Sequence, residues 1–539
     1  MTLADLLFPP AASTPAPEPV VGSVGDGAEV LVHFAGRSWT RDDIRDRADA
    51  LAGALGGVGV DAGAAVGVML PNGPDPVSAL FGVWRAGGVY VPLNPRLAGD
   101  EVDHIMASVD PAAIVTTAEL ADRFRDRFDG RPIIVATTDT WTADAATSPA
   151  TDPAEHRRHD PDVALIQFTS GTTGRPKPVL LLHSGVLTLL DGVLAKLRGP
   201  KPGAAPSGEA PTGDRPPPMP NLIPVSLSLW AGLYNVLFAM RVGAPVVLMD
   251  GFDPAEFAAL VAEFGLRSTV LPPAAMTMLA DDPSITDLTP LRFVRSITAP
   301  LSPLQAHRFH DKFAISVLNS YGQTEIGGEI VGWNAADSRA HGLTKLGSVG
   351  RPHDGVSLRV VDDDGNDLPA DQPGELWVLT PALSAGYADG SDLSDRLSAD
   401  GWFRTGDVVR IDAEGFVWIE GRVSSMINRG GLKVYPGEVE EVVRLHPEVV
   451  DVAVVGAPDD RLGEVPWAFV VRRDARPDGG PDLAPDIGPA LRAELEATCR
   501  EHLAPYKVPA GFQAIAELPR NEVGKVLVRP LVELIGSGA

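Results

Sequence analysis

A cluster of hydroxyl, glycine and lysine residues has the composition of a loop that binds phosphate groups. Residues 168–183 read FTSGTTGRPKPVLLLH and follow the apolar run at residues 163–166, which is typical of a buried strand. The polar residues of this turn are Thr169, Ser170, Gly171, Thr172, Thr173, Gly174 and Lys177. Glycines let backbone N–H groups approach an anion closely, and hydroxyl and ammonium groups donate hydrogen bonds to it. The pattern predicts a loop that holds a polyphosphate.

The spacing of the lysine distinguishes this loop from the common P-loop. A Walker-type loop needs Gly-Lys-Ser/Thr at the start of a helix, whereas Pro176 separates the last glycine from Lys177 here. A solvated Ser/Thr/Gly turn would explain an isolated loop of this composition, but the full string is more specific. TSGTTGRPKPV resembles the phosphate-loop signature of the adenylate-forming superfamily, which includes acyl-CoA synthetases, luciferases and adenylation domains. Pro178 departs from that signature, in which a small residue is usual.

A second glycine-containing turn follows an apolar strand at residues 317–329, which read VLNSYGQTEIGGE. An aromatic ring can stack on a base, a threonine can donate to a phosphate, and a glutamate can hold Mg²⁺ against phosphate oxygens. The resemblance implies that ATP and AMP contact Ser320, Tyr321, Gly322 and Thr324. It also implies catalytic roles for Glu325, as the Mg²⁺ ligand, and for Thr172.

A third segment, residues 401–422, reads GWFRTGDVVRIDAEGFVWIEGR. The carboxylate of Asp407 can accept hydrogen bonds from both ribose hydroxyls, although a surface aspartate in a turn is an equally ordinary explanation for this residue in isolation. In the resembled superfamily Arg422 is the companion of this aspartate at the nucleotide. We include Ile419 among the expected nucleotide contacts.

The C-terminal part of the chain resembles the small mobile domain of the same superfamily. Residues 503–531, LAPYKVPAGFQAIAELPRNEVGKVLVRPL, match its terminal signature, which implies that Lys525 is the catalytic lysine. The resemblance further implies that Gly430, Gly431 and Lys433 meet the thiol substrate, CoA. Ser424 and Ser425 stand in the hinge region, where Asp or Lys is usual, so the hinge lacks its usual charge.

Length and composition set limits on the protein's class. At 539 residues the chain is too long for one compact core, and a net charge of −26 argues against nucleic acid or an anionic membrane as a partner. The one cysteine, Cys499, excludes an intramolecular disulfide and fits a reducing cytoplasm. No apolar run approaches the roughly 20 residues of a membrane span. We therefore expect a cytoplasmic protein, and the sequence leaves a homodimer open.

Strands alternate with helices before the phosphate loop, with a helix expected at residues 40–55 and strands at 65–70 and 89–93. We predict an α/β fold with a large N-terminal domain of β-sheets packed with helices, residues 1–422. A small mobile α+β domain is expected at residues 423–539. Residues 198–222 are so rich in Pro, Gly and Ala that they predict a disordered insertion without regular elements.

The residues expected at the carboxylate substrate are mostly apolar. In the resembled superfamily one wall of the acyl pocket lies in residues 223–240, an apolar segment with the pattern of a buried helix. The predicted pocket residues are Leu227, Leu229, Trp230, Ile297 and Thr298. No aspartate for an α-amine occurs near residues 226–229 and no histidine between His183 and His307, which favours a fatty or aromatic acid. Ile297 and Thr298 replace usual glycines and should narrow the channel.

The resemblance covers residues from about 34 to 531 and implies an AMP-forming acyl-CoA synthetase. Such an enzyme uses ATP to convert a carboxylic acid into an acyl adenylate, from which CoA then displaces AMP. An acyl-AMP ligase that passes the acyl group to a carrier protein shares every ATP motif and remains an alternative. A non-catalytic nucleotide-binding protein is the alternative from another class, and Lys525 and Glu325 argue against it.

Overall fold

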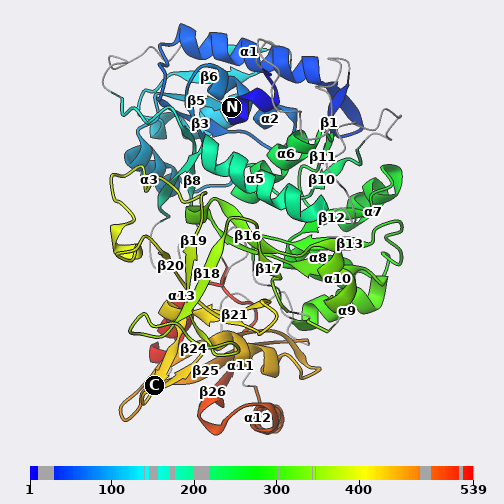
Figure 1. The fold of residues 1–539 in the computed structure, drawn as a ribbon, viewed down its shortest axis with the longest axis vertical. Coiled ribbons are helices and arrows are strands. Elements are labelled where there is room, and N and C mark those ends of the chain that lie inside the picture. Colours follow the sequence, from blue (N-terminus) through cyan, green and yellow to red (C-terminus); the bar gives the residue numbers. More distant parts are fainter. Residues whose placement is uncertain are drawn as a thin grey trace, which may run out of the picture.

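The computed structural model has a large body of sheets and helices at one end of its long axis and the elements that follow residue 422 at the other (Figure 1). It describes residues 1–9, 29–138, 140–144, 156–169, 176–198, 218–299, 301, 303–342, 344–345, 347–473, 487–520 and 526–537. The predicted α/β class with a large N-terminal part and a smaller C-terminal part is confirmed.

A seven-stranded sheet of order β7-β6-β5-β3-β4-β8-β9 carries the phosphate-loop segment. Its inner strands are parallel and consist almost wholly of buried apolar residues, while β7 and β9 are antiparallel at the two edges. The strands are β3 Ala65–Met69, β4 Val89–Pro92, β5 Ala113–Thr116, β6 Ile133–Ala136, β7 Trp141–Ala143, β8 Val163–Phe168 and β9 Pro178–Leu182. The associated helices are α1 Arg41–Gly57, α2 Pro74–Arg85, α3 Gly99–Val109, α4 Ala118–Phe124 and the 3₁₀ turn Arg125–Arg127.

The sequence specifies these elements locally. The hydroxyl of Thr40 accepts a hydrogen bond from the Asp43 N–H (3.1 Å), and the Asp43 carboxylate accepts one from the Thr40 N–H (2.7 Å). This reciprocal cap satisfies two donors at the start of α1. The predicted helix at 40–55 and the strands at 65–70 and 89–93 are confirmed.

Two further sheets complete the N-terminal body. One has the order β10-β11-β1-β2, with β1 Val30–Phe34, β2 Arg37–Thr40, β10 Asn221–Ile223 and β11 Val246–Leu248. The other is parallel, with β12 Ser268–Leu271, β13 Phe293–Ser296 and β14 Ser316–Asn319. The helices of this region are α5 His183–Arg198, α6 Trp230–Val242, α7 Pro254–Glu263, α8 Pro273–Asp281 and α9 Pro303–Phe313.

Antiparallel sheets connect this body to the C-terminal part. β15 Tyr321–Gln323, β16 Gly328–Gly332 and β17 Arg351–Pro352 form one of them, with the 3₁₀ turn Thr324–Ile326 and α10 Ala335–His341. β18 Ser357–Val361, β19 Gly374–Leu379, β20 Phe403–Ile411 and β21 Val417–Arg422 form the other, with the 3₁₀ turn Ser394–Arg396.

A separate sheet begins after residue 422. Its strands are β22 Ile427–Arg429, β23 Leu432–Val434, β24 Val449–Asp459, β25 Gly463–Arg472 and β26 Gly511–Ala514. Its helices are α11 Pro436–Val443, α12 Pro489–His502 and α13 Val528–Ser537, with 3₁₀ turns at Val423–Ser425 and Pro505–Lys507. Cys499 is fully buried within α12 and burial raises the pKa of its thiol to about 11, as befits a packing residue.

Two local expectations are corrected. The segment 198–222 is not free of regular elements at its ends, because Arg198 closes α5 and Asn221 begins β10; residues 199–217 lie outside the described part. The apolar segment 223–240 is helical only from Trp230, since β10 extends to Ile223. The region ahead of the first predicted helix also contains an unpredicted 3₁₀ turn, Leu3–Leu6.

That N-terminal turn is anchored beside the phosphate-loop hairpin. The backbone N–H of Leu3 donates to Nδ1 of His183 (3.2 Å), and the side chain of Leu3 is fully buried. Burial lowers the pKa of His183 to about 4, so the imidazole is neutral and Nδ1 can accept. The first residues of the chain therefore pack against the start of α5.

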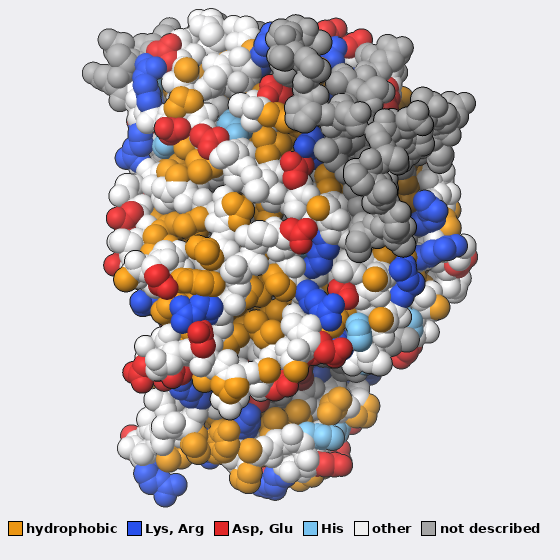
Figure 2. All heavy atoms as spheres, in the orientation of Figure 1, with side chains coloured by type: hydrophobic (Ala, Val, Ile, Leu, Met, Phe, Trp, Pro, Cys, Tyr) orange, Lys and Arg blue, Asp and Glu red, His pale blue; other side chains and the backbone are white. Residues whose placement is uncertain are grey.

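The surface carries acidic and basic side chains interspersed rather than gathered into one basic patch on the face that Figure 2 shows. Among the described residues, no helix is both long and apolar enough to cross a membrane.

Candidate active site

The described ends of the phosphate loop are joined to each other. The Thr169 N–H donates to the carbonyl of Lys177 (3.0 Å), and the Lys177 N–H donates to Oγ1 of Thr169 (3.2 Å). β8 and β9 thus form an antiparallel hairpin whose neck is closed by this pair. The predicted phosphate contacts Ser170, Gly171, Thr172, Thr173 and Gly174 lie outside the described residues.

Lys177 lies over an aromatic ring that the sequence motifs do not include. Its ammonium nitrogen is 4.7 Å from the ring centroid of Tyr387, a favourable cation–π distance. The segment with Tyr387 runs beside β9, since the Leu180 N–H donates to Gly386 (2.9 Å) and the Ala388 N–H donates to Pro178 (2.8 Å). Backbone hydrogen bonds therefore bring residues 386–388 to the phosphate-loop lysine.

Glu325, the expected Mg²⁺ ligand, forms an ion pair with Arg396. Nη1 of Arg396 lies 3.0 Å from Oε1 of Glu325, and the glutamate side chain keeps only 13% of its surface exposed. The same guanidinium donates to the carbonyl of Thr405 (2.7 Å) and to Oε1 of Gln323 (3.3 Å). Arg396 therefore links the second motif to the strand that carries the third.

Asp407, the expected ribose contact, accepts hydrogen bonds at both carboxylate oxygens. Oδ2 accepts from the hydroxyl of Tyr321 and from Nε2 of Gln323, both at 2.6 Å, while Nε of Arg422 lies 2.8 Å from Oδ1. Burial and the neighbouring Asp407 carboxylate raise the pKa of Tyr321 well above its usual value, so its hydroxyl stays protonated and donates. Tyr321, Asp407 and Arg422 are brought together as neighbours.

The other predicted nucleotide residues lie on the same elements. Ser320 donates to the carbonyl of Ser296 (3.2 Å), Thr324 begins a 3₁₀ turn, and Ile419 is half-buried on β21. Gly322 permits a close backbone approach, because a Cβ there would lie 1.8 Å from the carbonyl oxygen of Gly328. A side chain at position 322 would force β15 and β16 apart.

The predicted acyl-pocket residues differ in burial. Leu227 and Trp230 are buried, and Nε1 of Trp230 donates to the carbonyl of Gly327 (3.0 Å). Leu229 and Ile297 are half-buried. Thr298 is exposed and has a φ of 73°, a left-handed conformation that favours glycine.

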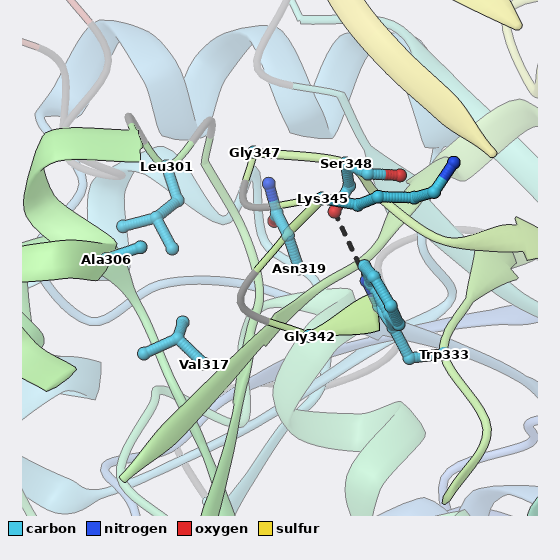
Figure 3. Close-up of a pocket in the computed structure, with 9 residues that line it drawn as sticks. All are labelled: Leu301, Ala306, Val317, Asn319, Trp333, Gly342, Lys345, Gly347 and Ser348. Atoms are coloured by element: carbon cyan, nitrogen blue, oxygen red, sulfur yellow. Dashed lines mark hydrogen bonds between the residues drawn. The ribbon is translucent and has the colours of Figure 1, made fainter. Parts of the chain in front are cut away.

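A small cavity of about 10 Å³ lies next to the second motif and is lined by Val317, Asn319, Trp333 and Ser348 among others (Figure 3). Nε1 of Trp333 donates to the carbonyl of Ser348 (3.2 Å) beside it. This volume is far below the roughly 300–1,000 Å³ of typical ligand pockets. The cavity therefore does not hold a whole nucleotide by itself.

The residues expected to meet the thiol lie on the β22–β23 hairpin of the C-terminal sheet. Gly430 and Gly431 have φ values of 60° and 90°, which form its tight turn. Nζ of Lys433 lies 2.7 Å from both carboxylate oxygens of Asp363, in the turn after β18. Lys433 thus binds the preceding antiparallel sheet.

The structure describes the predicted hinge residues but not the predicted catalytic lysine. Ser424 is exposed, and Oγ of Ser425 donates to the carbonyl of Arg422 (3.3 Å) within a 3₁₀ turn between two sheets. The predicted catalytic residue Lys525 lies outside the described part of the chain.

The carboxylate chemistry fits a magnesium ion held largely by its nucleotide. Mg²⁺ commonly binds through one or two carboxylates plus substrate phosphates, and Glu325 offers one carboxylate at the phosphate-loop side of the site. Within the described ranges, no group of three or more His, Cys, Asp or Glu side chains could form a cage around a metal.

Family models match most of the chain. The AMP-binding enzyme model matches residues 23–388, and the model of the AMP-binding enzyme C-terminal domain matches residues 438–525. The chain belongs to the AMP-binding enzyme family. The resemblance inferred from the motifs is thereby confirmed.

Similar proteins support the enzyme class. A sulfoacetate–CoA ligase of Cupriavidus necator is 31% identical, with 93% of each chain covered. A fatty acid–[acyl-carrier-protein] ligase, ScoC, of Streptomyces coeruleorubidus is 30% identical over 92% of this chain and 91% of ScoC. The crystal structure of ATP-bound MatB from Rhodopseudomonas palustris superimposes with a TM-score of 0.81 at 25% identity over 99% of both chains. The prediction of an AMP-forming acid–thiol ligase with ATP and CoA as substrates is confirmed.

Several contacting residues were not predicted from the sequence. Gln323 stands inside the second motif, but nothing in the motif distinguishes its amide as a link to Asp407. Arg396, Tyr387 and His104 stand outside the quoted phosphate-loop and nucleotide motifs. Of these residues only Tyr387 could have been suspected, because it is an aromatic residue a short distance before the third motif.

His104 on α3 contacts both ends of the phosphate-loop hairpin. Its Nε2 lies 2.9 Å from the carbonyl oxygen of Pro176, to which it donates, and its ring meets Phe168 edge-on at 6.1 Å between centroids. Residues 168 and 176 bracket the predicted phosphate contacts. We infer that His104 positions the loop.

We expect His104→Ala to raise KM for ATP by roughly 2- to 10-fold, the value of one neutral hydrogen bond, with kcat and KM for the acid nearly unchanged. His104→Gln, which retains an N–H donor of similar reach, should restore most of the loss. ATP/pyrophosphate exchange measures all three constants, and His446→Ala in the C-terminal part is the control. Equal effects on both KM values would contradict a role at the phosphate loop.

We expect Thr298→Gly to increase the free energy of unfolding by up to about 1 kcal/mol. Relief of the left-handed conformation is worth about 1–2 kcal/mol, and the greater freedom of glycine in the unfolded chain offsets part of it. Urea denaturation measures the change. Thr188→Gly inside α5 should instead destabilise the protein, and a loss of similar size at both positions would show that residue 298 is unstrained.

Proposed function

We propose that this enzyme activates a fatty or aromatic carboxylic acid as its acyl adenylate and then transfers the acyl group to CoA. One observation carries the proposal: a continuous hydrogen-bonded network joins the expected metal ligand to the expected ribose ligand. Glu325 pairs with Arg396, Arg396 donates to Gln323, and Gln323 donates to Asp407. The network thus joins the second motif to the third.

The chemistry follows from the inertness of a carboxylate. A carboxylate oxygen attacks the α-phosphorus of ATP and pyrophosphate leaves, which converts the anion into a mixed anhydride. The sulfur of CoA then bonds to the acyl carbon, its proton is lost, and AMP leaves. Without the first step, a negatively charged acid would repel the incoming thiolate.

We assign the chain's residues to these steps as follows. The hairpin closed by Thr169 and Lys177 binds the terminal phosphates, with the ammonium of Lys177 held beside them by Tyr387. Asp407 and Arg422 hold the ribose, and Tyr321 lies against the base. Lys525 stabilises negative charge on the α-phosphate during the attack.

Glu325 would hold Mg²⁺, which supplies positive charge at the phosphate oxygens when bound. Oε1 of Glu325 already accepts a hydrogen bond from Arg396, so the arginine fixes one oxygen of the carboxylate.

The nature of the acid follows from the wall residues. Leu227 and Trp230 are apolar and buried, and Leu229 and Ile297 are apolar and half-buried. These side chains favour an apolar body in the acid rather than a small, fully charged one. We expect Ile297→Gly to admit larger acids.

CoA and the phosphopantetheine of a carrier protein are the two candidate thiol acceptors. The relatives include several CoA ligases and one carrier-protein ligase of about equal identity, so a direct assay is needed to show whether a carrier protein also accepts the acyl group. An ATP/pyrophosphate exchange screen over a panel of acids, followed by thioester assays with CoA and with a phosphopantetheinylated carrier, tests the proposal. Exchange without thioester formation on CoA would favour the carrier.

We propose that residues 1–422 and 423–539 are the two domains and that the chain pivots at Ser424 and Ser425. In support, β21 ends one sheet at Arg422 and β22 begins another at Ile427. Lys525 and the Gly430–Gly431 turn belong to the same domain but serve different steps, so the domain must turn between them.

We place the enzyme in the cytoplasm because of its single cysteine and its co-substrates. Light scattering would detect a homodimer.

We expect Lys525→Ala to lower the rate of adenylate formation by about 10²–10³ while ATP still binds, because the lysine acts mainly on charge that develops in the transition state. Acyl-AMP formation is measured by pyrophosphate exchange and ATP affinity by calorimetry. Lys507→Ala is the control, since that lysine pairs with Glu438. Near-normal exchange by the Lys525 variant would refute the assignment.

A further inference from the structure

A buried polar cluster lies near Trp230, one of the predicted acyl-pocket residues, and is not used by the mechanism above. Nη2 of Arg295 donates to Oε2 of Glu329, and Nε2 of His353 lies 3.2 Å from Oε1 of the same carboxylate. The side chains of His353, Glu329 and Arg295 keep only 2%, 12% and 20% of their surface exposed. The cluster also includes the hydroxyl of Tyr234, whose electrostatic neighbours are Glu329 and Arg295.

Like Nδ1 of His353, the hydroxyl of Tyr234 has no hydrogen-bond partner among the described residues. The side chain is 5% exposed, so bulk water does not replace the missing partner. A buried hydroxyl without a partner is unfavourable, and native structures rarely retain one without a reason. A ligand group that hydrogen-bonds this oxygen would supply the reason.

The position of this hydroxyl links it to the acyl pocket. The ring of Tyr234 contacts Trp230 edge-on, with 5.7 Å between the ring centroids, and Nε1 of Trp230 donates a hydrogen bond to the carbonyl of Gly327. Arg295 lies on β13, and Ile297 comes directly after the last residue of that strand, Ser296. Trp230, one of the predicted wall residues, therefore adjoins the polar cluster through Tyr234, and Ile297 lies close to the cluster along the chain.

The charges of the cluster decide which kind of group it can take. Burial alone would raise the pKa of Glu329, but the Arg295 guanidinium and His353 hold it at about 2, so the carboxylate is ionised and compensates the arginine. Nζ of Lys196 donates hydrogen bonds to the carbonyls of Gly332 and Pro352. Tyr234 thus adjoins a charge-compensated ion pair, which suits a neutral hydrogen-bonding group better than a second carboxylate.

We propose that the acid activated by this enzyme carries a neutral hydrogen-bonding substituent, such as a hydroxyl, at the end remote from its carboxylate, and that Tyr234 binds it. The proposal rests on the proposed function and narrows its substrate class. Trp230 and Ile297 contact the apolar body of the acid, and Tyr234 binds its polar end. The Arg295–Glu329–His353 network positions that end of the pocket.

The test uses pairs of acids that differ by one hydroxyl. 3-Phenylpropionic acid is compared with 3-(4-hydroxyphenyl)propionic acid, and octanoic acid with 8-hydroxyoctanoic acid, with suberic acid as the dicarboxylate. ATP/pyrophosphate exchange gives kcat/KM for each acid with the full-length enzyme. We expect the hydroxylated member of at least one pair to be preferred by roughly 10- to 100-fold, since a site built to bind a hydroxyl rejects the analogue without it.

Tyr234→Phe removes the oxygen and little else. We expect it to reduce the preference to within about threefold of unity by lowering kcat/KM for the hydroxylated acid, while the plain acid is unaffected. Because the oxygen has no protein partner, the melting temperature should stay the same or rise. Tyr90→Phe, at a buried tyrosine on β4, is the matched control and should leave the preference unchanged.

The outcomes separate this inference from the function on which it rests. Exchange with plain acids and no preference for hydroxylated ones, or a preference that survives in Tyr234→Phe, would overturn the inference alone. A preference for suberic acid would overturn the neutral character of the group. A lower melting temperature for Tyr234→Phe would show that the hydroxyl is structural, and no exchange with any acid would remove both proposals.

Discussion

The ion pair between Arg396 and Glu325 is the interaction on which the candidate active site depends. An enzyme with a net charge of −26 must still bind a polyphosphate, so cations have to be concentrated locally and kept from collapsing onto random acidic groups. Lys177, whose ammonium lies over the ring of Tyr387, is such a cation. Arg396 instead fixes the carboxylate of Glu325, because its guanidinium is bound on several sides, by Glu325, by Gln323 and by the Thr405 carbonyl.

This arrangement extends through Asp407, which Tyr321, Gln323 and Arg422 hold from three sides. A carboxylate with so many donors has one orientation, and preorganised groups lose little entropy when a ligand binds. The close contact of β15 with β16, which Gly322 alone permits, keeps Tyr321 and Gln323 in place. The geometry at the nucleotide site is thus supported by the backbone as well as by side chains.

The region of the predicted acyl wall combines apolar and charged side chains. Leu227 and Trp230 are apolar and buried, but the same region largely buries Arg295, Glu329 and His353, whose desolvation is unfavourable unless they pair. Arg295 and His353 bind the carboxylate of Glu329, while the Tyr234 hydroxyl and Nδ1 of His353 have no partner among the described residues. The predicted wall therefore adjoins polar atoms as well as apolar side chains.

The sequence by itself determined the family and the α/β class, because these depend on contiguous residues such as TSGTTG and YGQTE and on apolar periodicity. The Thr40 cap of α1 was also readable, since Thr40 and Asp43 are three residues apart. The partners of the motif residues were decided only by the tertiary structure. Arg396 is 71 residues from Glu325, and Tyr321 is 86 from Asp407.

A single sequence does not reveal long-range pairs of this kind, because local propensities do not specify which distant side chains will contact one another. The same reason explains why Tyr387, His104 and the Arg295–Glu329–His353 cluster were not foreseen, and why Arg198 and Asn221 proved to be helical and extended although the Pro- and Gly-rich composition between them suggested otherwise. Composition averages over a window, whereas α5 and β10 are held by packing and sheet pairing with partners far along the chain.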